Sequence, residues 1–129
     1  MAGEGIFTVP AAGGSLTEVV ANQDHPYGLV VDAESIFFAT RQGVMRMPRA
    51  GGAPTLIAAA TQRIVGLASD GASVYWTDFY ANTVSRVSRD GGAVATLATG
   101  QRGAYAIAVD GRYVYWTTYW DGTVLRLPK

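Results

Sequence analysis

The sequence predicts an all-β chain, and two observations carry the prediction. Short runs rich in Val, Ile, Tyr, Phe, Trp and Thr alternate with clusters of Gly, Asp and Asn, a pattern typical of strands joined by turns. A unit of about 40 residues also occurs three times, and no stretch shows an apolar helical stripe bounded by caps. Each unit has room for four short strands, so three four-stranded antiparallel units are expected.

Three anchors keep the units in step. The first is a glycine pair that begins at Gly13, Gly51 and Gly91, which gives offsets of 38 and 40 residues. The second anchor reads "GLVVD", "GLASD" and "AIAVD" and ends, with the same offsets, at Asp32, Asp70 and Asp110. The third is an apolar and aromatic run, "IFFAT", "VYWTD" and "VYWTT", at residues 36–40, 74–78 and 114–118. Four strands at this period indicate the blade of a β-propeller.

The strands follow one another in a fixed order within each unit. An inner strand of the "YGLVV" type precedes the "VYWT" strand, a "TVSRV" strand comes next, and a "VATLA" strand follows the glycine pair. Residues 1–129 are therefore predicted to form a single propeller-repeat domain with units at 13–50, 51–90 and 91–129. Residues 1–12 should add a strand from an incomplete preceding blade, because "GIFTVPAAGG" aligns with "TVSRVSRDGG". Thirteen strands are expected where three blades need twelve.

The run "VYWTD", preceded by "GLASDG" and followed by "TVSRVSRDGG", resembles the YWTD repeats of low-density-lipoprotein-receptor propellers and their NHL-related bacterial relatives. The complete string stands only at residues 75–78 and becomes "YWTT" and "FFAT" in the other copies. The resemblance covers essentially the whole chain. It implies a six-bladed ring, of which three blades would be half, and it suggests an extracellular or periplasmic location.

Large aromatic residues occupy one position in all three units. These residues, expected to fill the gaps between adjacent blades, are Phe38, Trp76 and Trp116. The recurrent aspartates stand where an Asp side chain can accept hydrogen bonds from backbone amides two residues on, so they are interpreted as turn residues. A carboxylate site is the alternative for these aspartates.

Composition and charge exclude several classes of function. Ten acidic side chains balance ten basic ones, which removes the basic footprint of a nucleic-acid binder. No apolar run approaches the roughly 20 residues of a membrane span, so neither nucleic acid nor membrane is expected as a partner. The chain has one His and no Cys, and it shows no metal-ligand spacing and no nucleophile elbow. No catalytic residue, metal or cofactor is therefore expected.

Two interpretations explain a chain with three blades. Either it is cut from a longer propeller, or two copies associate head to tail, with three blades each, into a six-bladed ring. In the second case residues 16–20 of one copy supply the missing outer strand of the other, and the exposed blade faces are covered. One of two third strands, at 5–9 or 123–127, is then surplus, and the sequence leaves open which one pairs.

The candidate ligand-binding residues lie where loops should gather on one rim. The loops before the inner strands read "NQDHPYG", "ATQRIVG" and "GQRGAYA", and they differ in charge between copies. The turns after the "YWTD" strands carry paired aromatics in copies two and three but shorten to "TRQG" in copy one. The candidates are Asp24, His25, Tyr27, Arg63, Phe79, Tyr80, Arg102, Tyr105, Tyr119 and Trp120.

Three functions are consistent with these features. The first is a non-catalytic half-propeller that forms a homodimeric ring and serves as a scaffold or interaction module. The second is a propeller that binds glycan or peptide through the rim aromatics, which could equally serve to cover neighbouring loops. The third is a piece of a propeller enzyme of the lactonase or lyase kind, with Asp24 and His25 in its site.

Overall fold

The computed structural model describes residues 5–59 and 62–129, and this part of the chain forms thirteen strands and no helix. The strands are β1 (Gly5–Thr8), β2 (Thr17–Ala21), β3 (Tyr27–Val31), β4 (Ser35–Thr40), β5 (Gly43–Pro48), β6 (Thr55–Ala59), β7 (Ile64–Ser69), β8 (Ser73–Asp78), β9 (Thr83–Ser88), β10 (Ala95–Ala98), β11 (Ala104–Val109), β12 (Tyr113–Thr118) and β13 (Thr123–Pro128). Both the all-β class and the strand count agree with the prediction. Residues 1–4 of the extra segment and residues 60–61 of the second unit lie outside the described residues.

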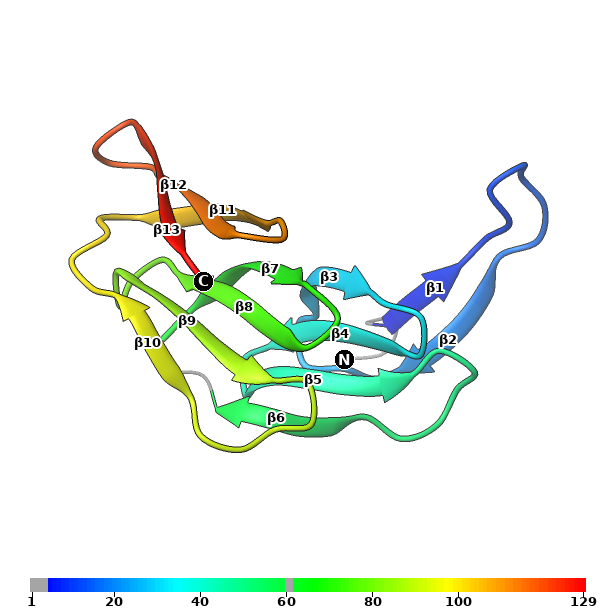
Figure 1. The fold of residues 1–129 in the computed structure, drawn as a ribbon. Coiled ribbons are helices and arrows are strands. Elements are labelled where there is room, and N and C mark those ends of the chain that lie inside the picture. Colours follow the sequence, from blue (N-terminus) through cyan, green and yellow to red (C-terminus); the bar gives the residue numbers. More distant parts are fainter. Residues whose placement is uncertain (1–4, 60–61) are drawn as a thin grey trace.

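The strands form four antiparallel sheets that follow one another along the chain (Figure 1). The first blade is β3-β4-β5-β6, the second blade is β7-β8-β9-β10, and the third blade is β11-β12-β13. The strands β1 and β2 pair as an N-terminal hairpin beside the first blade. The inner strands β3, β7 and β11 lie next to one another, and each blade extends outward from them (Figure 1).

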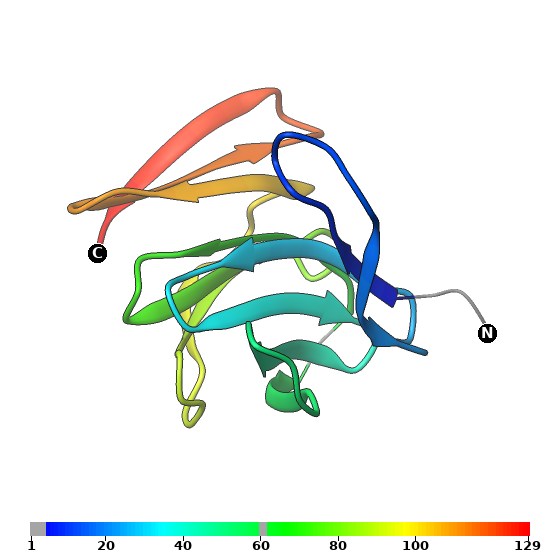
Figure 2. The same ribbon diagram turned by 90° about the vertical axis from the view of Figure 1, so that its right-hand side faces the viewer.

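The two ends of the chain are incomplete blades, as the repeat predicts. The N-terminal hairpin supplies a third and a fourth strand, and its connecting loop projects away from the rest of the molecule (Figure 1). The third blade has three strands and lies at the other end of the row of sheets (Figure 1), and Figure 2 shows it above the first two blades. Because β13 pairs only with β12 among the described strands, its outer edge carries no partner there.

Three apolar clusters hold the sheets together, one at each junction. Phe38 is buried with Ile6 and Met47 between the N-terminal hairpin and the first blade. Trp76 lies with Phe37 and other core residues between the first and second blades. Trp116 packs with Tyr75 and its neighbours between the second and third blades. The structure thus places all three repeat aromatics between sheets, where each is at most 4% exposed.

The recurrent aspartates close the turns between the first two strands of each blade. In each case one carboxylate oxygen accepts hydrogen bonds from the amides two and three residues later, at 2.8–2.9 Å. This geometry confirms the turn interpretation of Asp32, Asp70 and Asp110. The negative charge of each carboxylate is held on one rim of the molecule, called here the turn rim.

The third blade departs from the sequence expectation in one respect. The run "AIAV" in β11 suggests a strand covered on both faces, yet Ala106 and Ala108 are exposed. Their equivalents in the second blade face the third blade, whereas no sheet follows β11–β13 in the described chain. None of the described residues forms a helix long and apolar enough to cross a membrane.

Candidate functional site

The rim opposite the turn rim, called here the mouth, gathers six loops. Hydrogen bonds between backbones join the loop before each inner strand to the turn after the second strand of the same blade. Arg41 N donates to Asp24 O at 3.4 Å, Phe79 N to Arg63 O at 2.9 Å, and Tyr119 N to Gly103 O at 2.8 Å. The same pairing in every blade brings the predicted candidate residues onto one surface.

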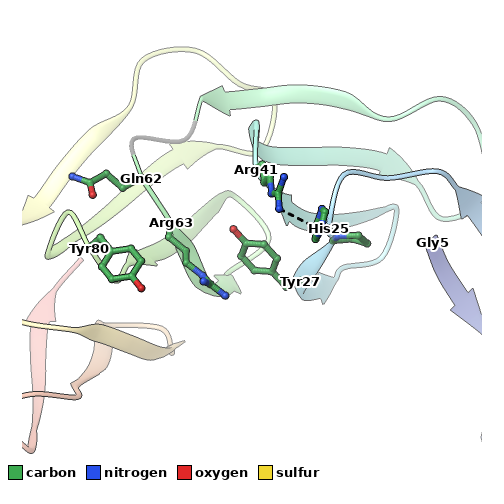
Figure 3. Close-up of a pocket in the computed structure, with 8 residues that line it drawn as sticks. Gly5, His25, Tyr27, Arg41, Gln62, Arg63 and Tyr80 are labelled. Atoms are coloured by element: carbon green, nitrogen blue, oxygen red, sulfur yellow. Dashed lines mark hydrogen bonds between the residues drawn. The ribbon is translucent and has the colours of Figure 1, made fainter. Parts of the chain in front are cut away.

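A pocket of about 1090 Å³ opens at the mouth between the first and second blades (Figure 3). Its lining combines cationic, aromatic and amide side chains with backbone: Gly5, His25, Pro26, Tyr27, Arg41, Gln62, Arg63 and Tyr80. Figure 3 shows Tyr27 and Arg63 pointing toward each other across this space. The Arg63 guanidinium carbon lies 5.7 Å from the centre of the Tyr27 ring. The pocket therefore presents positive charge beside an aromatic face.

Hydrogen bonds order the histidine side of the pocket. His25 Nδ1 lies 3.0 Å from a carboxylate oxygen of Asp24, and Arg41 Nη2 lies 3.3 Å from His25 Nε2. His25 has a φ of 51°, in the left-handed region that non-glycine residues seldom adopt. Tyr27 is half-buried, and this burial raises the pKa of its phenol above the ordinary value. The phenol is accordingly neutral at physiological pH.

The last residue of the "YWTD" run positions the arginine side. Asp78 is fully buried, and its carboxylate accepts hydrogen bonds from the amides of Gln62 and Arg63, each at 3.0 Å. It also accepts one from the amide of Ala81 at 2.9 Å. The first blade has Thr40 at this position, where the hydroxyl accepts a hydrogen bond from the amide of Gln42. Asp78 thus fixes the loop that presents Arg63 to the mouth.

The rim aromatics form one cluster across the second and third blades. Phe79 is half-buried at its centre, with ring centroids of Tyr80, Tyr105, Tyr119 and Trp120 between 5.2 and 6.1 Å away. The four outer rings remain 51–62% exposed. The aromatic tips therefore cover one another and still present a broad aromatic surface, which continues into the pocket at Tyr80.

One predicted candidate takes part in neither the pocket nor the aromatic cluster, and two polar side chains of the pocket were not predicted. Arg102 lies at the mouth but does not line the pocket, and it forms an ion pair with Asp121 at 2.8 Å. Arg41 and Gln62 line the pocket although neither was among the predicted site residues. The signal for Arg41 was its place in the short turn "TRQG", which the repeat alignment sets beside the loop of His25. Within residues 5–59 and 62–129, no group of three acidic or histidine side chains could hold a metal ion.

The outward face of the third blade is exposed where the matching faces of the other blades are covered. Val44 and Val84, at one repeat position, are fully buried at the two blade junctions, whereas their equivalent Val124 is 75% exposed. The first blade shows the complementary defect on its other side. Leu29 is 50% exposed, but its equivalent Leu67 in the second blade is 8% exposed. We call the two surfaces marked by Val124 and Leu29 the open faces.

Ion pairs cross both blade junctions at the turn rim. Arg89 of the second blade donates to the Asp32 carboxylate of the first at 2.8 Å. Lys129, after β13, donates to the Asp70 carboxylate of the second blade at the same distance. Burial acts to raise the pKa of both carboxyls, but the cation and the turn amides outweigh it and hold each pKa below the ordinary range. These pairs tie each blade to the one before it.

No protein-family model matches the chain, and no curated protein matches it. Several solved structures do. A chain of the nidogen/laminin complex aligns with a TM-score of 0.87 at 15% identity over 97% of this chain and 51% of its own. The computationally designed Ika4 protein gives 0.79 at 16% identity over 96% and 79%. Virginiamycin B lyase from Staphylococcus aureus gives 0.77 at 16% identity over 97% and 45%.

These similarities confirm the fold. The chain is built of β-propeller repeats, and its three blades match the sheets of propeller proteins. It spans about half the length of the nidogen/laminin-complex chain and of the lyase. The structures that resemble it comprise both an enzyme and proteins that are not named as enzymes.

Proposed function

We propose that the chain is a non-catalytic half-propeller, and that two copies associate head to tail into a six-bladed ring that acts as a scaffold or interaction module. The observation that carries this proposal is the pair of open faces. Each consists of repeat positions that are buried at the internal junctions and exposed at the ends. A contact between the Val124 face of one copy and the Leu29 face of the next closes after two copies if each spans half a circle.

The energetics favour closure over separate chains. A stable interface buries on the order of 800 Å² per partner, and a two-copy ring forms two such contacts in one association. Dry faces of this type resemble a domain core cut in half, which is the character of obligate dimers. Their exposure on a single chain would leave apolar patches of the kind that soluble monomers rarely tolerate.

Light scattering at micromolar concentration tests the ring. A single species of about 27 kDa, twice the chain mass of 13.6 kDa, is the expected result. The unfolding temperature should also rise with protein concentration, because assembly and folding are coupled. A stable species of 13.6 kDa would contradict the proposal. Polydisperse material would also contradict the proposal, and it would support the alternative that the chain is cut from a longer propeller.

The mouth supports a second function, the binding of an acidic peptide. The pocket presents Arg41 and Arg63 beside Tyr27, and the aromatic cluster continues from it at Tyr80. Guanidinium groups bind carboxylates in bidentate geometry, and exposed aromatic rings supply apolar contact without much loss of side-chain entropy. A peptide with a carboxylate next to an apolar side chain fits both features.

A peptide array containing acidic, neutral and basic series tests this function. Binding should favour the acidic series and should fall about tenfold or more in Arg63→Gln and in Tyr119→Ala. Arg112→Gln is the matched control, because Arg112 lies at the turn rim. Equal binding of all three series would contradict a role for the arginines. Preferential binding to a parallel glycan array would favour the glycan alternative instead.

A further inference from the structure

The ion pairs of the turn rim follow the repeat. Arg49, Arg89 and Lys129 are equivalent residues, 40 positions apart, and each follows the third strand of its blade. Arg89 and Lys129 both reach back to the turn aspartate of the preceding blade. Lys129 donates in addition to the backbone carbonyl of Asp110, the turn aspartate of its own blade, at 2.9 Å. Arg49 donates to the equivalent carbonyl in the first blade, that of Asp32, at 3.2 Å. Lys129 therefore has both acceptors, one in its own blade and one in the blade before, whereas Arg89 shows the second and Arg49 the first.

One cation and one carboxylate are left over at the two ends. Arg49 belongs to the first blade, and among the described residues it forms no ion pair. Asp110 belongs to the third blade, where Tyr115 donates to its second carboxylate oxygen at 2.8 Å. No described cation forms an ion pair with Asp110. The turn amides nevertheless lower the pKa of Asp110, so its carboxylate is charged at neutral pH.

The surplus third strand can be assigned from the same repeat. Arg126 in β13 and Lys129 directly after it stand at positions that hold arginine in both complete blades, whereas β1 and the loop after it have Thr8 and Ala11 there. The strand β13 pairs with β12 without a break from Thr118↔Thr123 to Tyr113↔Pro128. The strand β1 pairs with β2 over four residues, with a register shift after Ile6. Loss of β1 therefore costs less than loss of β13.

Ile6 and Val124 occupy the same repeat position on these two strands. Ile6 packs against Phe38 and Met47 on the face of the first blade. Val124 points outward from the third blade and is 75% exposed. If the third blade docks on the first blade of a second copy, Val124 takes the place that Ile6 holds in the single chain.

Resting on the ring proposed above, we propose that β13 replaces β1 of the other copy at each of the two contacts between copies, called here the seams. The strand β2 of one copy then adds to the free edge of β13 of the other and completes the third blade. Arg49 of one copy pairs with the Asp110 carboxylate of the other, in the geometry of Arg89 with Asp32. The partner is thus a second copy of this chain, recognised by strand addition, apolar contact and one charge pair per seam.

The spacing of the seam follows from the inner strands. A Cβ atom added at Gly66 would lie 2.5 Å from the Tyr105 carbonyl oxygen, whereas one added at Gly28 would lie 3.4 Å from that of Val65. The third blade has Ala106 at this position, which carries a methyl group. The seam therefore takes the wider spacing seen between the first and second blades.

Engineered cysteines test the strand replacement, and the chain contains no cysteine of its own. Phe7 pairs with Glu18 in the hairpin, so Leu125 should face Glu18 of the other copy once β13 replaces β1. Under mild oxidation, Leu125→Cys with Glu18→Cys should give a covalent species of about 27 kDa, twice 13.6 kDa. The control is Phe7→Cys with Glu18→Cys, whose disulfide joins two residues of one chain and leaves the mass at 13.6 kDa. This disulfide should form readily if β1 stays paired with β2 and less readily in the ring, where β13 of the other copy takes the place of β1.

The outcomes separate this inference from the ring itself. Dimeric wild-type protein without a Leu125–Glu18 cross-link would overturn the strand replacement and leave the ring standing. Monomeric wild-type protein would overturn the ring and the seam together. A covalent 27 kDa species that also appears under denaturing oxidation would be nonspecific and would count against the seam.

A double-mutant cycle tests the charge pair. Arg49→Gln and Asp110→Asn remove the charges, and the asparagine keeps an oxygen for the turn amides. Each change should weaken the dimer about tenfold, because an exposed pair contributes modestly and forms twice per ring. The double variant should be no weaker than either single variant, while Arg112→Gln should leave assembly unchanged. Additive effects, or none, would overturn the pairing.

Discussion

The second and third blades follow the same repeat pattern but have very different environments. "VYWTDFYANTVSRVSRDGG" and "VYWTTYWDGTVLRLPK" align through their central strands, and the tryptophan of each is 4% exposed. The second blade is covered on both faces. The third is covered on one, so Val84 is fully buried while its equivalent Val124 is 75% exposed.

The burial of a repeat position therefore depends on whether a neighbouring sheet covers it. In the second blade the residues of β8 that point toward the first blade and those that point toward the third are all buried except Ser73 at its start. In β12 they alternate between buried and half-buried, because only one face has a neighbour. An apolar residue on the uncovered face is therefore interpretable as part of a contact that the single chain does not make.

The largest expected effect lies at a covered junction. Trp76→Ala should lower the free energy of unfolding by about 3–5 kcal/mol, because the side chain is only 4% exposed and its removal leaves a cavity between the first and second blades. Trp120→Ala is the matched control, since that side chain is 62% exposed at the mouth and should cost under about 1 kcal/mol. Chemical denaturation measures both. Equal losses would show that the junctions do not form the core.

The next effect compares the equivalent valines directly. Val84→Ala should cost about 2 kcal/mol at any protein concentration, because its side chain is buried within one chain. Val124→Ala should change the unfolding temperature little at nanomolar concentration, because the side chain is exposed when the copies are separate. At high micromolar concentration it should lower the unfolding temperature, since the residue is then buried in the seam. An effect of Val124→Ala that is independent of concentration would contradict its role in assembly.

Much of the fold could be predicted because it depends on local spacing. The repeat offsets of 38 and 40 residues predicted the strand order, the incomplete blade at each end and the positions of the buried tryptophans. These features need only the strand period and turn chemistry, which repeat in every unit. The exposure of Ala106 and Ala108 was missed because it depends on whether another sheet follows.

The candidate site was predictable as a set of loops but not as a set of contacts. Alignment of the three repeats predicted that His25, Arg63 and the aromatic pairs lie on one rim. It did not show that Phe79 lies at the centre of a cluster or that Arg41 reaches His25. Those contacts join different turns or blades, and their geometry depends on the angle between sheets. The cross-blade ion pairs were missed for the same reason, although the 40-residue spacing of Arg49, Arg89 and Lys129 could have indicated them.

The smallest expected effect compares Asp70, which has a cation from the next blade, with an exposed acidic residue. Asp70→Asn should cost about 1 kcal/mol at pH 7, because the asparagine keeps the turn acceptor but loses the ion pair with Lys129. Burial acts to raise the pKa of Asp70. Lys129, the two turn amides and the Tyr75 hydroxyl lower it by more than burial raises it, so the pKa in the folded state lies below the pKa in the unfolded state. A lowered pKa stabilises the fold above the unfolded value, near pH 4, and this stabilisation is lost as the pH falls toward the folded value.

The difference between wild type and Asp70→Asn should therefore be complete at pH 7, begin to shrink below about pH 5 and be smaller at pH 3. Urea unfolding across this range, at one protein concentration, measures the difference. Asp90→Asn serves as the control, because that side chain is 75% exposed in its pair with Arg46 and should change stability little at any pH. A gap for Asp70→Asn that stays constant from pH 7 to pH 3 would show that the ion pair between the second and third blades contributes nothing in solution.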